Sequence, residues 1–192
     1  MTVTFHSMAH KNTLQLQSSA LCIIDMQEAF RSNIAEFTNL SLSIALMCEA
    51  AKLLHLPTLV TEQYPKGLGH TAAEIKAALL PETVIVEKTT FSSCGVQPFR
   101  EQLESTKARQ IIVCGIEAHI CVNQTVHDLL ADNYQVHLLV DCIGSRSADN
   151  RKAGLAKMQM SGAIPSSVEL CLFELLRDAK HEQFKGVQRL VR

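Results

Sequence analysis

Short apolar runs alternate along this chain with longer segments of helical spacing, and this alternation constrains the fold more than any other feature. Each run has four to seven residues and is rich in Ile, Val or Leu. Such continuous apolarity is typical of strands that are buried on both faces of a parallel sheet. The expected strands cover residues 20–25, 58–61, 83–87, 110–114 and 135–141, and a sixth, as short as 163–164, precedes Pro165.

The segments between these runs are expected to be helices. They cover residues 34–54, 71–80, 96–104, 123–131, 148–160 and 167–178. Strands that alternate with helices form parallel sheets through right-handed crossovers. A chain of 192 residues, 47% of them hydrophobic, is large enough for one domain with a sizeable hydrophobic core, whereas two domains would each have a small core. We therefore predict one three-layer α/β/α, Rossmann-like domain over 1–192, in which residues 1–18 form a polar arm or an extra turn.

Composition excludes several classes of partner. The formal net charge is −1, from 18 basic and 19 acidic residues, and no basic block stands out, so nucleic acid is not favoured as the main partner. The longest apolar stretch, residues 40–56, is interrupted by polar side chains and falls short of the ~20 residues that span a bilayer. We therefore expect no membrane partner.

The cysteines indicate a reducing environment. There are seven of them, scattered along the chain and without a C-x-x-C pair, which argues against a disulfide framework and against a zinc site. The first 19 residues lack the apolar centre of a signal peptide. We expect an intracellular, cytoplasmic protein, with an organelle left open.

Three of the apolar runs lead into reactive side chains. Asp25 follows the first run, Lys88 follows the third, and Cys121 stands between the fourth run and a helix. Ligands of open α/β sheets bind outside the carboxyl ends of the strands. A helix N-terminus also favours a thiolate over a thiol. An acid, a base and a nucleophile are thus expected at one rim of the sheet.

These three residue types together can hydrolyse a carbonyl compound. A thiol attacks a carbonyl as the thiolate; Asp25 can accept its proton, and Lys88 can keep the carboxylate ionised. Backbone N–H groups of the turn before Cys121 can stabilise the oxyanion. Each residue alone has an ordinary alternative, as a helix cap, a solvated lysine or an inert cysteine, so the prediction depends on a shared rim.

Three sequence blocks carry a family resemblance. They are DMQxxF at 25–30, KxxFS at 88–92 and GIEAHICV at 115–122. In order and spacing they resemble the signature blocks of the isochorismatase-like cysteine hydrolases, which include nicotinamidases, N-carbamoyl amidohydrolases and isochorismatases. The likeness covers roughly residues 19–176. The loop TEQYPKGLG at 61–69 looks most like a non-nicotinamidase branch of isochorismatase-domain proteins whose substrates are poorly defined.

The resemblance implies a fold and a set of site residues. It implies a six-stranded, mainly parallel sheet in the order 3-2-1-4-5-6 and a catalytic triad of Asp25, Lys88 and Cys121. It also implies a cis peptide bond before Glu117, with the backbone N–H groups of Glu117 and Cys121 as the oxyanion hole.

Four further residues are candidates for substrate binding. Phe30 and Phe91 line the pocket by family analogy, and both would otherwise be assigned to the core. Tyr64 lies on the loop 62–70, where it either covers a substrate or simply packs. Gln27 either positions a polar group of the substrate or hydrogen-bonds the loop.

The departures from the family narrow the chemistry. Nicotinamidases of this family hold a metal with an Asp-x-His pair, whereas residues 61–64 here read TEQY; we expect no metal and no other cofactor. True isochorismatases act without the cysteine, so Cys121 favours C–N hydrolysis of a small amide, ureide or imide. We expect a homo-oligomer of two or more copies. The alternative is a weakly active or inactive protein that keeps the fold for binding.

Overall fold

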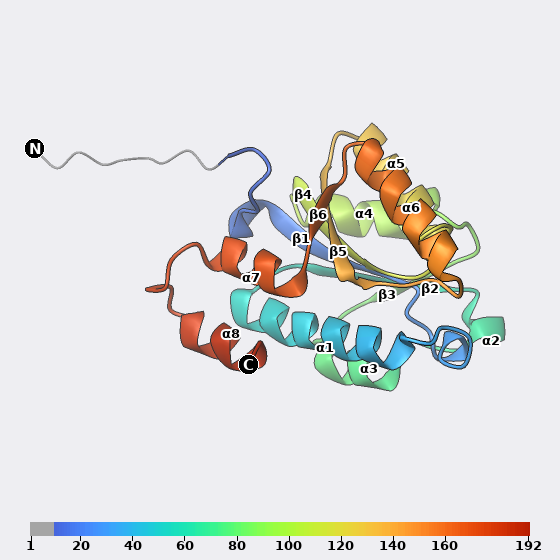
Figure 1. The fold of residues 1–192 in the computed structure, drawn as a ribbon, viewed down its shortest axis with the longest axis horizontal. Helices are drawn as coiled ribbons and strands as arrows, with labels where there is room; N and C mark the ends of the chain where they lie inside the picture. Colours follow the sequence, from blue (N-terminus) through green and yellow to red (C-terminus); the bar gives the residue numbers. More distant parts are fainter. Residues whose placement is uncertain (1–9) are drawn as a thin grey trace, which may run out of the picture.

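A six-stranded parallel sheet forms the centre of the protein in the computed structural model, which describes residues 10–192 (Figure 1). The strands are β1 Ser19–Ile24, β2 Thr58–Gln63, β3 Ile85–Lys88, β4 Gln110–Gly115, β5 Gln135–Ile143 and β6 Ile164–Ser166. Their order is β3-β2-β1-β4-β5-β6, and every neighbouring pair is parallel. The predicted fold class and strand order are confirmed. Pro165 lies within β6, an edge strand, where the missing N–H is tolerated.

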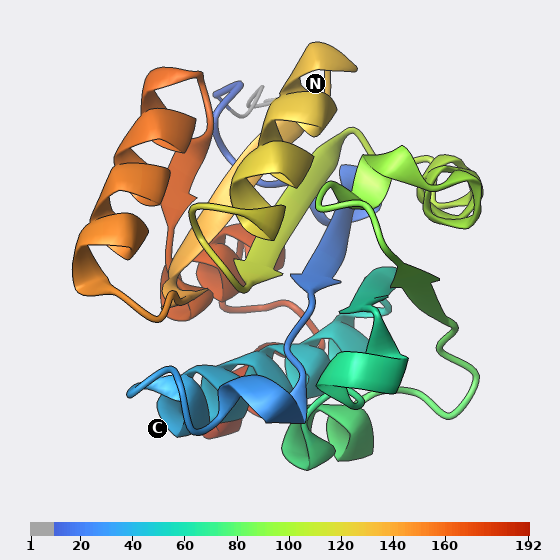
Figure 2. The same ribbon diagram turned by 90° about the vertical axis from the view of Figure 1, so that its right-hand side faces the viewer.

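Helices cover both faces of the sheet. They are α1 Phe37–Leu54, α2 Pro65–Leu68, α3 Ala73–Ala78, α4 Gln97–Ser105, α5 Cys121–Ala131, α6 Ala148–Met160, α7 Val168–Leu176 and α8 Phe184–Leu190, with 3-10 turns at Leu16–Ser18, Glu28–Phe30 and Ser93–Gly95. Figures 1 and 2 show α1, α3, α7 and α8 on one face and α4, α5 and α6 on the other. The result is the predicted three-layer arrangement.

Two hydrophobic clusters hold these layers together. Every residue of β1 is buried, and successive side chains of a strand point to opposite faces. Leu21 and Ile23 accordingly join the cluster under α1 and α7, while Cys22 and Ile24 join the cluster under α4 and α5. The central strand therefore supplies both cores and its carboxyl end is held rigidly.

Helix α1 is long and apolar enough to cross a membrane by length and composition, the one such helix among residues 10–192. Half of this segment is buried inside the protein. It contacts α3, α8 and β5, which is the placement of a core helix.

Several element boundaries differ from the predicted ones. Helix α5 begins at Cys121 and not at 123, because Ile120 already occupies the N-cap position. The loop 62–70 contains the end of β2 and the one-turn helix α2, and α8 lies beyond the last predicted helix. Residues 1–9 of the predicted arm lie outside the described part, whereas the next residues pack on the domain: Leu14 is buried in the cluster under α1.

One buried histidine makes the fold sensitive to acid. His137 in β5 is 1% exposed, its Nε2 has no hydrogen-bond partner among residues 10–192, and burial lowers its pKa to about 4. An unfolded histidine titrates near 6.5, so the unfolded state binds the proton first as the pH falls below that value. At pH 5 the wild type should have lost about 2 kcal/mol of unfolding free energy from this residue.

Chemical denaturation at pH 7 and pH 5 checks this expectation. In the His137→Leu variant, the decrease in the free energy of unfolding from pH 7 to pH 5 should be smaller than in the wild type by about 2 kcal/mol. An identical pH dependence in the two proteins would show that His137 is not the acid-sensitive group.

Candidate active site

The carboxyl ends of β1 and β3 bring Asp25 and Lys88 together. Asp25 follows β1 in a left-handed backbone conformation (φ 51°), and Lys88 is the last residue of β3. Strand β2 separates these two strands, and the lysine side chain spans the gap: its Nζ lies 2.6 Å from Asp25 Oδ2. Both side chains are at most 2% exposed. A charge pair removed from water to this degree is strongly coupled, because losing either partner leaves an uncompensated buried charge.

The ammonium group of Lys88 has four oxygen acceptors within hydrogen-bond distance. Besides Asp25, it donates to Gln63 Oε1 at 2.8 Å, to the Phe91 carbonyl at 3.0 Å and to the Thr90 carbonyl at 3.2 Å. Four acceptors share three N–H groups. The ammonium group is therefore held in one place and has no N–H to spare for a substrate.

Asp25 is held by a second contact on its other oxygen. The Thr61 hydroxyl donates to Oδ1 at 2.7 Å, and the Asp25 backbone N–H donates to the Thr61 carbonyl at 3.1 Å. The two carboxylate oxygens thus have separate partners, a hydroxyl and an ammonium group. This arrangement fixes the plane of the carboxylate.

Cys121 completes the cluster as the first residue of α5. Cys121 is 7% exposed, and the charges of the Asp25 carboxylate and the Lys88 ammonium group both act on its thiol. Burial raises the pKa of the thiol to about 12, the negative charge of Asp25 adds to this rise, and Lys88 opposes it. These influences together favour the protonated thiol, the form from which Asp25 is expected to accept the proton.

The turn before Cys121 is packed closely against its neighbours. The peptide bond between Ile116 and Glu117 is cis. A Cβ on Gly115 would lie 2.1 Å from the Ile24 carbonyl oxygen, and one on Gly154 would lie 2.6 Å from that of Ala118. Only glycine fits at these two contacts, which set the turn beside the end of β1 and against α6.

The same turn leaves two backbone donors without backbone partners. The N–H groups of Glu117 and Cys121 make no backbone hydrogen bond within residues 10–192.

The Glu117 side chain binds the turn to the loop after β5. Its buried carboxylate accepts hydrogen bonds from the backbone N–H of Arg146 at 2.9 Å and from the Arg146 guanidinium at 3.0 Å. Arg146 thereby braces the turn, a contact the sequence did not indicate.

The Gln27 side chain hydrogen-bonds the loop 62–70, the second of its two expected roles. Its side chain is fully buried. Its amide donates to the carbonyls of Gln63 and Gly69 at 2.9 and 2.7 Å and accepts from the Gln63 backbone N–H at 2.7 Å. Both amide N–H groups are used, so none remains for a substrate.

The three aromatic candidates lie in different surroundings. Phe30 is half-buried and packs against the cluster under α1. Phe91 and Tyr64 are 53% and 54% exposed on the two segments next to Lys88: the Phe91 carbonyl accepts from the lysine, and the Tyr64 N–H donates to the Lys88 carbonyl at 2.8 Å. Phe91 and Tyr64 are therefore available at the rim, while Phe30 is shared with the core.

Two residues that contact the charge pair were not predicted. Thr61 and Gln63 lie in the TEQY segment at 61–64, in which Tyr64 was the one candidate site residue expected from the sequence. Their spacing of two places them on one face of β2, between β1 and β3. Glu62 faces the other way, where it accepts from the N–H and hydroxyl of Thr71.

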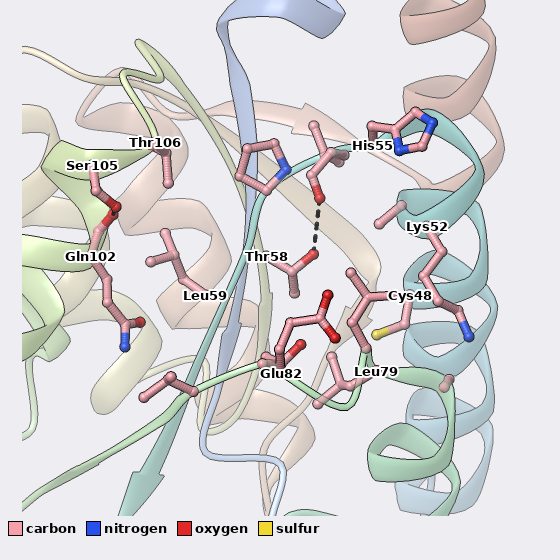
Figure 3. Close-up of a pocket in the computed structure, with 17 residues that line it drawn as sticks. Cys48, Lys52, His55, Thr58, Leu59, Leu79, Glu82, Gln102, Ser105 and Thr106 are labelled. Carbon is pink, nitrogen blue, oxygen red and sulfur yellow. Dashed lines mark hydrogen bonds between the residues drawn. The ribbon is translucent and has the colours of Figure 1, made fainter.

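A cavity of about 670 Å³ lies at the amino ends of strands β2 and β3, away from the candidate site (Figure 3). It is lined by Thr58 at the start of β2, by Val84 just before β3 and by residues at the ends of α1, α3 and α4. None of the candidate catalytic residues lines it. Within residues 10–192, no group of three or more His, Cys, Asp or Glu is arranged to hold a metal ion.

Comparisons with known proteins agree on one family. The isochorismatase domain model matches residues 19–169. Isochorismatase domain-containing protein 2 is 42% identical over 176 residues in Homo sapiens, covering 91% of this chain and 83% of that protein. The Danio rerio protein of the same name is 39% identical over 186 residues, covering 96% and 92%.

Solved structures with 30% identity or more share the fold of this chain. The MAR1 ribonuclease from Caenorhabditis elegans has a TM-score of 0.89 and 41% identity, covering 93% of this chain and 92% of that one. A hypothetical protein from Trypanosoma cruzi has a TM-score of 0.88 and 30% identity, covering 94% and 96%. The chain has the fold of the isochorismatase-family hydrolases, and it belongs to the isochorismatase family.

Proposed function

We propose that this protein is a cysteine hydrolase that cleaves the C–N bond of a small amide, ureide or imide-like substrate. One observation carries the proposal: Asp25 and Lys88 form a buried pair at 2.6 Å, and the charges of both act on the Cys121 thiol at the start of α5. A nucleophile beside a base that is itself oriented by a third group is the arrangement that covalent hydrolysis requires.

The first half of the reaction forms an acyl-enzyme. The Cys121 sulfur attacks the carbonyl carbon while its proton passes to Asp25, as the raised pKa of the thiol requires. The backbone N–H groups of Glu117 and Cys121 stabilise the oxyanion. Asp25 then returns the proton to the leaving nitrogen, the C–N bond breaks, and a thioester remains.

The second half releases the acid. Asp25 takes a proton from water, and the resulting hydroxide attacks the thioester carbon. The C–S bond breaks, the acid leaves, and the sulfur regains the proton from Asp25. Lys88 stays cationic throughout and balances the charge that moves between carboxylate and sulfur.

We also propose that the substrate reaches the site between Tyr64 and Phe91, whose exposed rings lie on the two segments next to Lys88. The protein is further proposed to form a homo-oligomer and to act in a reducing intracellular compartment. All seven cysteines are free and buried, which supports the reducing compartment.

A second candidate is cleavage of RNA, favoured by the likeness to the C. elegans protein named as a ribonuclease. Asp25 could act as a base on a ribose hydroxyl, and Cys121 would then have no covalent role. The net charge of −1 gives little general attraction for a polyanion. A catalytically inactive binding protein is a further alternative.

A substrate screen separates these functions. Small amides, ureides and imides are assayed for released amine or ammonia, and a labelled single-stranded RNA is assayed for cleavage. We expect turnover of one amide-type class and intact RNA. RNA cleavage without amide turnover would favour the ribonuclease, and inactivity on both would favour the binding protein.

A further inference from the structure

Gln63 is held in a single orientation beside Lys88. It is the last residue of β2 and lies directly opposite Lys88 in the register with β3. Its amide N–H donates to the Thr89 carbonyl at 2.8 Å, which turns the amide oxygen toward the Lys88 ammonium group, also at 2.8 Å. Gln27 fixes the Gln63 backbone through both its N–H and its carbonyl.

The amide oxygen is a neutral acceptor, and this matters for the charge balance of the site. It binds one N–H of Lys88 without cancelling the positive charge. Asp25 alone then neutralises the ammonium group, and Cys121 lies within the influence of both. A carboxylate in place of the amide would compete with Asp25 and with the sulfur anion for the same cation.

We propose that Gln63 is a positioning residue, whose amide oxygen holds the Lys88 ammonium group where it stabilises the Cys121 sulfur anion as the thiol loses its proton. This inference rests on the proposed cysteine chemistry. Thr61 acts in parallel on Asp25 and does not touch the lysine. Gln63 therefore acts on the nucleophile through Lys88, without touching the substrate.

The test follows the alkylation of Cys121 by iodoacetamide against pH, without substrate, read by peptide mass spectrometry. In Gln63→Met the ammonium group loses a fixed acceptor, and alkylation at pH 8 should slow by about three- to tenfold, because the thiolate fraction falls tenfold for each unit of pKa. Gln63→Glu adds a negative charge and should slow it further. The matched control is Gln97→Met, because Gln97 is exposed at the start of α4 and its side chain donates a hydrogen bond to Glu101, away from the site.

The inference is overturned if both Gln63 variants alkylate with the wild-type pH profile. If the methionine variant fails to fold, the glutamate variant, which keeps the shape of the side chain, decides alone. The variant Asp25→Asn, measured in the same way, distinguishes a failure of the role of Gln63 from a failure of the proposed triad. A shift in that variant with none in the Gln63 variants removes only the role of Gln63, whereas no shift in any of them removes the proposed triad as well.

Discussion

Replacing Cys121 with alanine is expected to abolish hydrolysis and leave the fold intact. The sulfur is the proposed nucleophile, and removing a nucleophile that works as a unit with its base lowers kcat by about 10⁴-fold or more. Alanine suits the first turn of α5, so the loss of one buried sulfur atom should cost about 1 kcal/mol. Product release under saturating substrate and thermal unfolding measure the two effects.

The matched control for this variant is Cys171→Ala. Cys171 is fully buried in α7, in the cluster on the other face of the sheet, so its loss should lower stability similarly and leave kcat near the wild-type value. If Cys121→Ala retained activity within about tenfold of wild type, the covalent mechanism would be wrong.

Replacing Asp25 with asparagine is expected to change turnover and thiol reactivity in opposite directions. Turnover should be lost, because asparagine cannot accept the thiol proton or activate water. The Cys121 thiol should become more acidic, because Asp25 is the negative charge that raises its pKa, and Lys88 remains to pair with the thiolate. Alkylation at pH 8 should therefore rise by about tenfold or more.

Stability must be followed in the same experiment. Asparagine leaves the Lys88 ammonium group without its buried partner, a loss of about 3–5 kcal/mol unless the Cys121 thiolate takes that place. The double variant Asp25→Asn/Lys88→Met removes both charges and serves as the control, in which the thiol should titrate as an ordinary buried cysteine. Slower alkylation of Asp25→Asn than of wild type would contradict the proposed coupling.

The sheet was predictable because its signal is local and repeated. Buried strands such as β1 and β4 are mostly apolar, and the helices between them have clear spacing, so the parallel direction of the strands follows from few rules. The strand order was expected from the family resemblance. The short helix α2 and the terminal helix α8 were not predicted. The former lies in a segment rich in Pro and Gly, and the latter is outside the alternating pattern.

The site was predictable in its charged and nucleophilic members and not in their supports. Asp25 and Lys88 stand at the carboxyl ends of β1 and β3, and Cys121 begins the helix that follows β4, so all three are expected on one rim of the sheet. Thr61 and Gln63 are neutral residues of a common type, and their roles depend on which strand lies between β1 and β3. For Gln27 the sequence allowed both a substrate contact and a hydrogen bond to the loop 62–70, and the structure shows the hydrogen bonds.

The pKa of the Cys121 thiol depends on more than its place in the sequence. A helix N-terminus favours the thiolate, and the sequence contains that signal. Burial raises the pKa of the thiol, and so does the charge of Asp25, a residue about a hundred positions away in the sequence. In the proposed mechanism the proton therefore leaves the sulfur during attack on the substrate.

Mass spectrometry of the acid-quenched reaction tests the central claim most directly. Wild-type protein is mixed with a substrate from the screen and quenched within one turnover. The protein is then digested, and the mass of the peptide that contains Cys121 is measured. The account predicts that this peptide gains the mass of the acyl group before the free acid accumulates. Appearance of the acid with no acyl mass on Cys121 at any time, or with that mass on another residue, would contradict it.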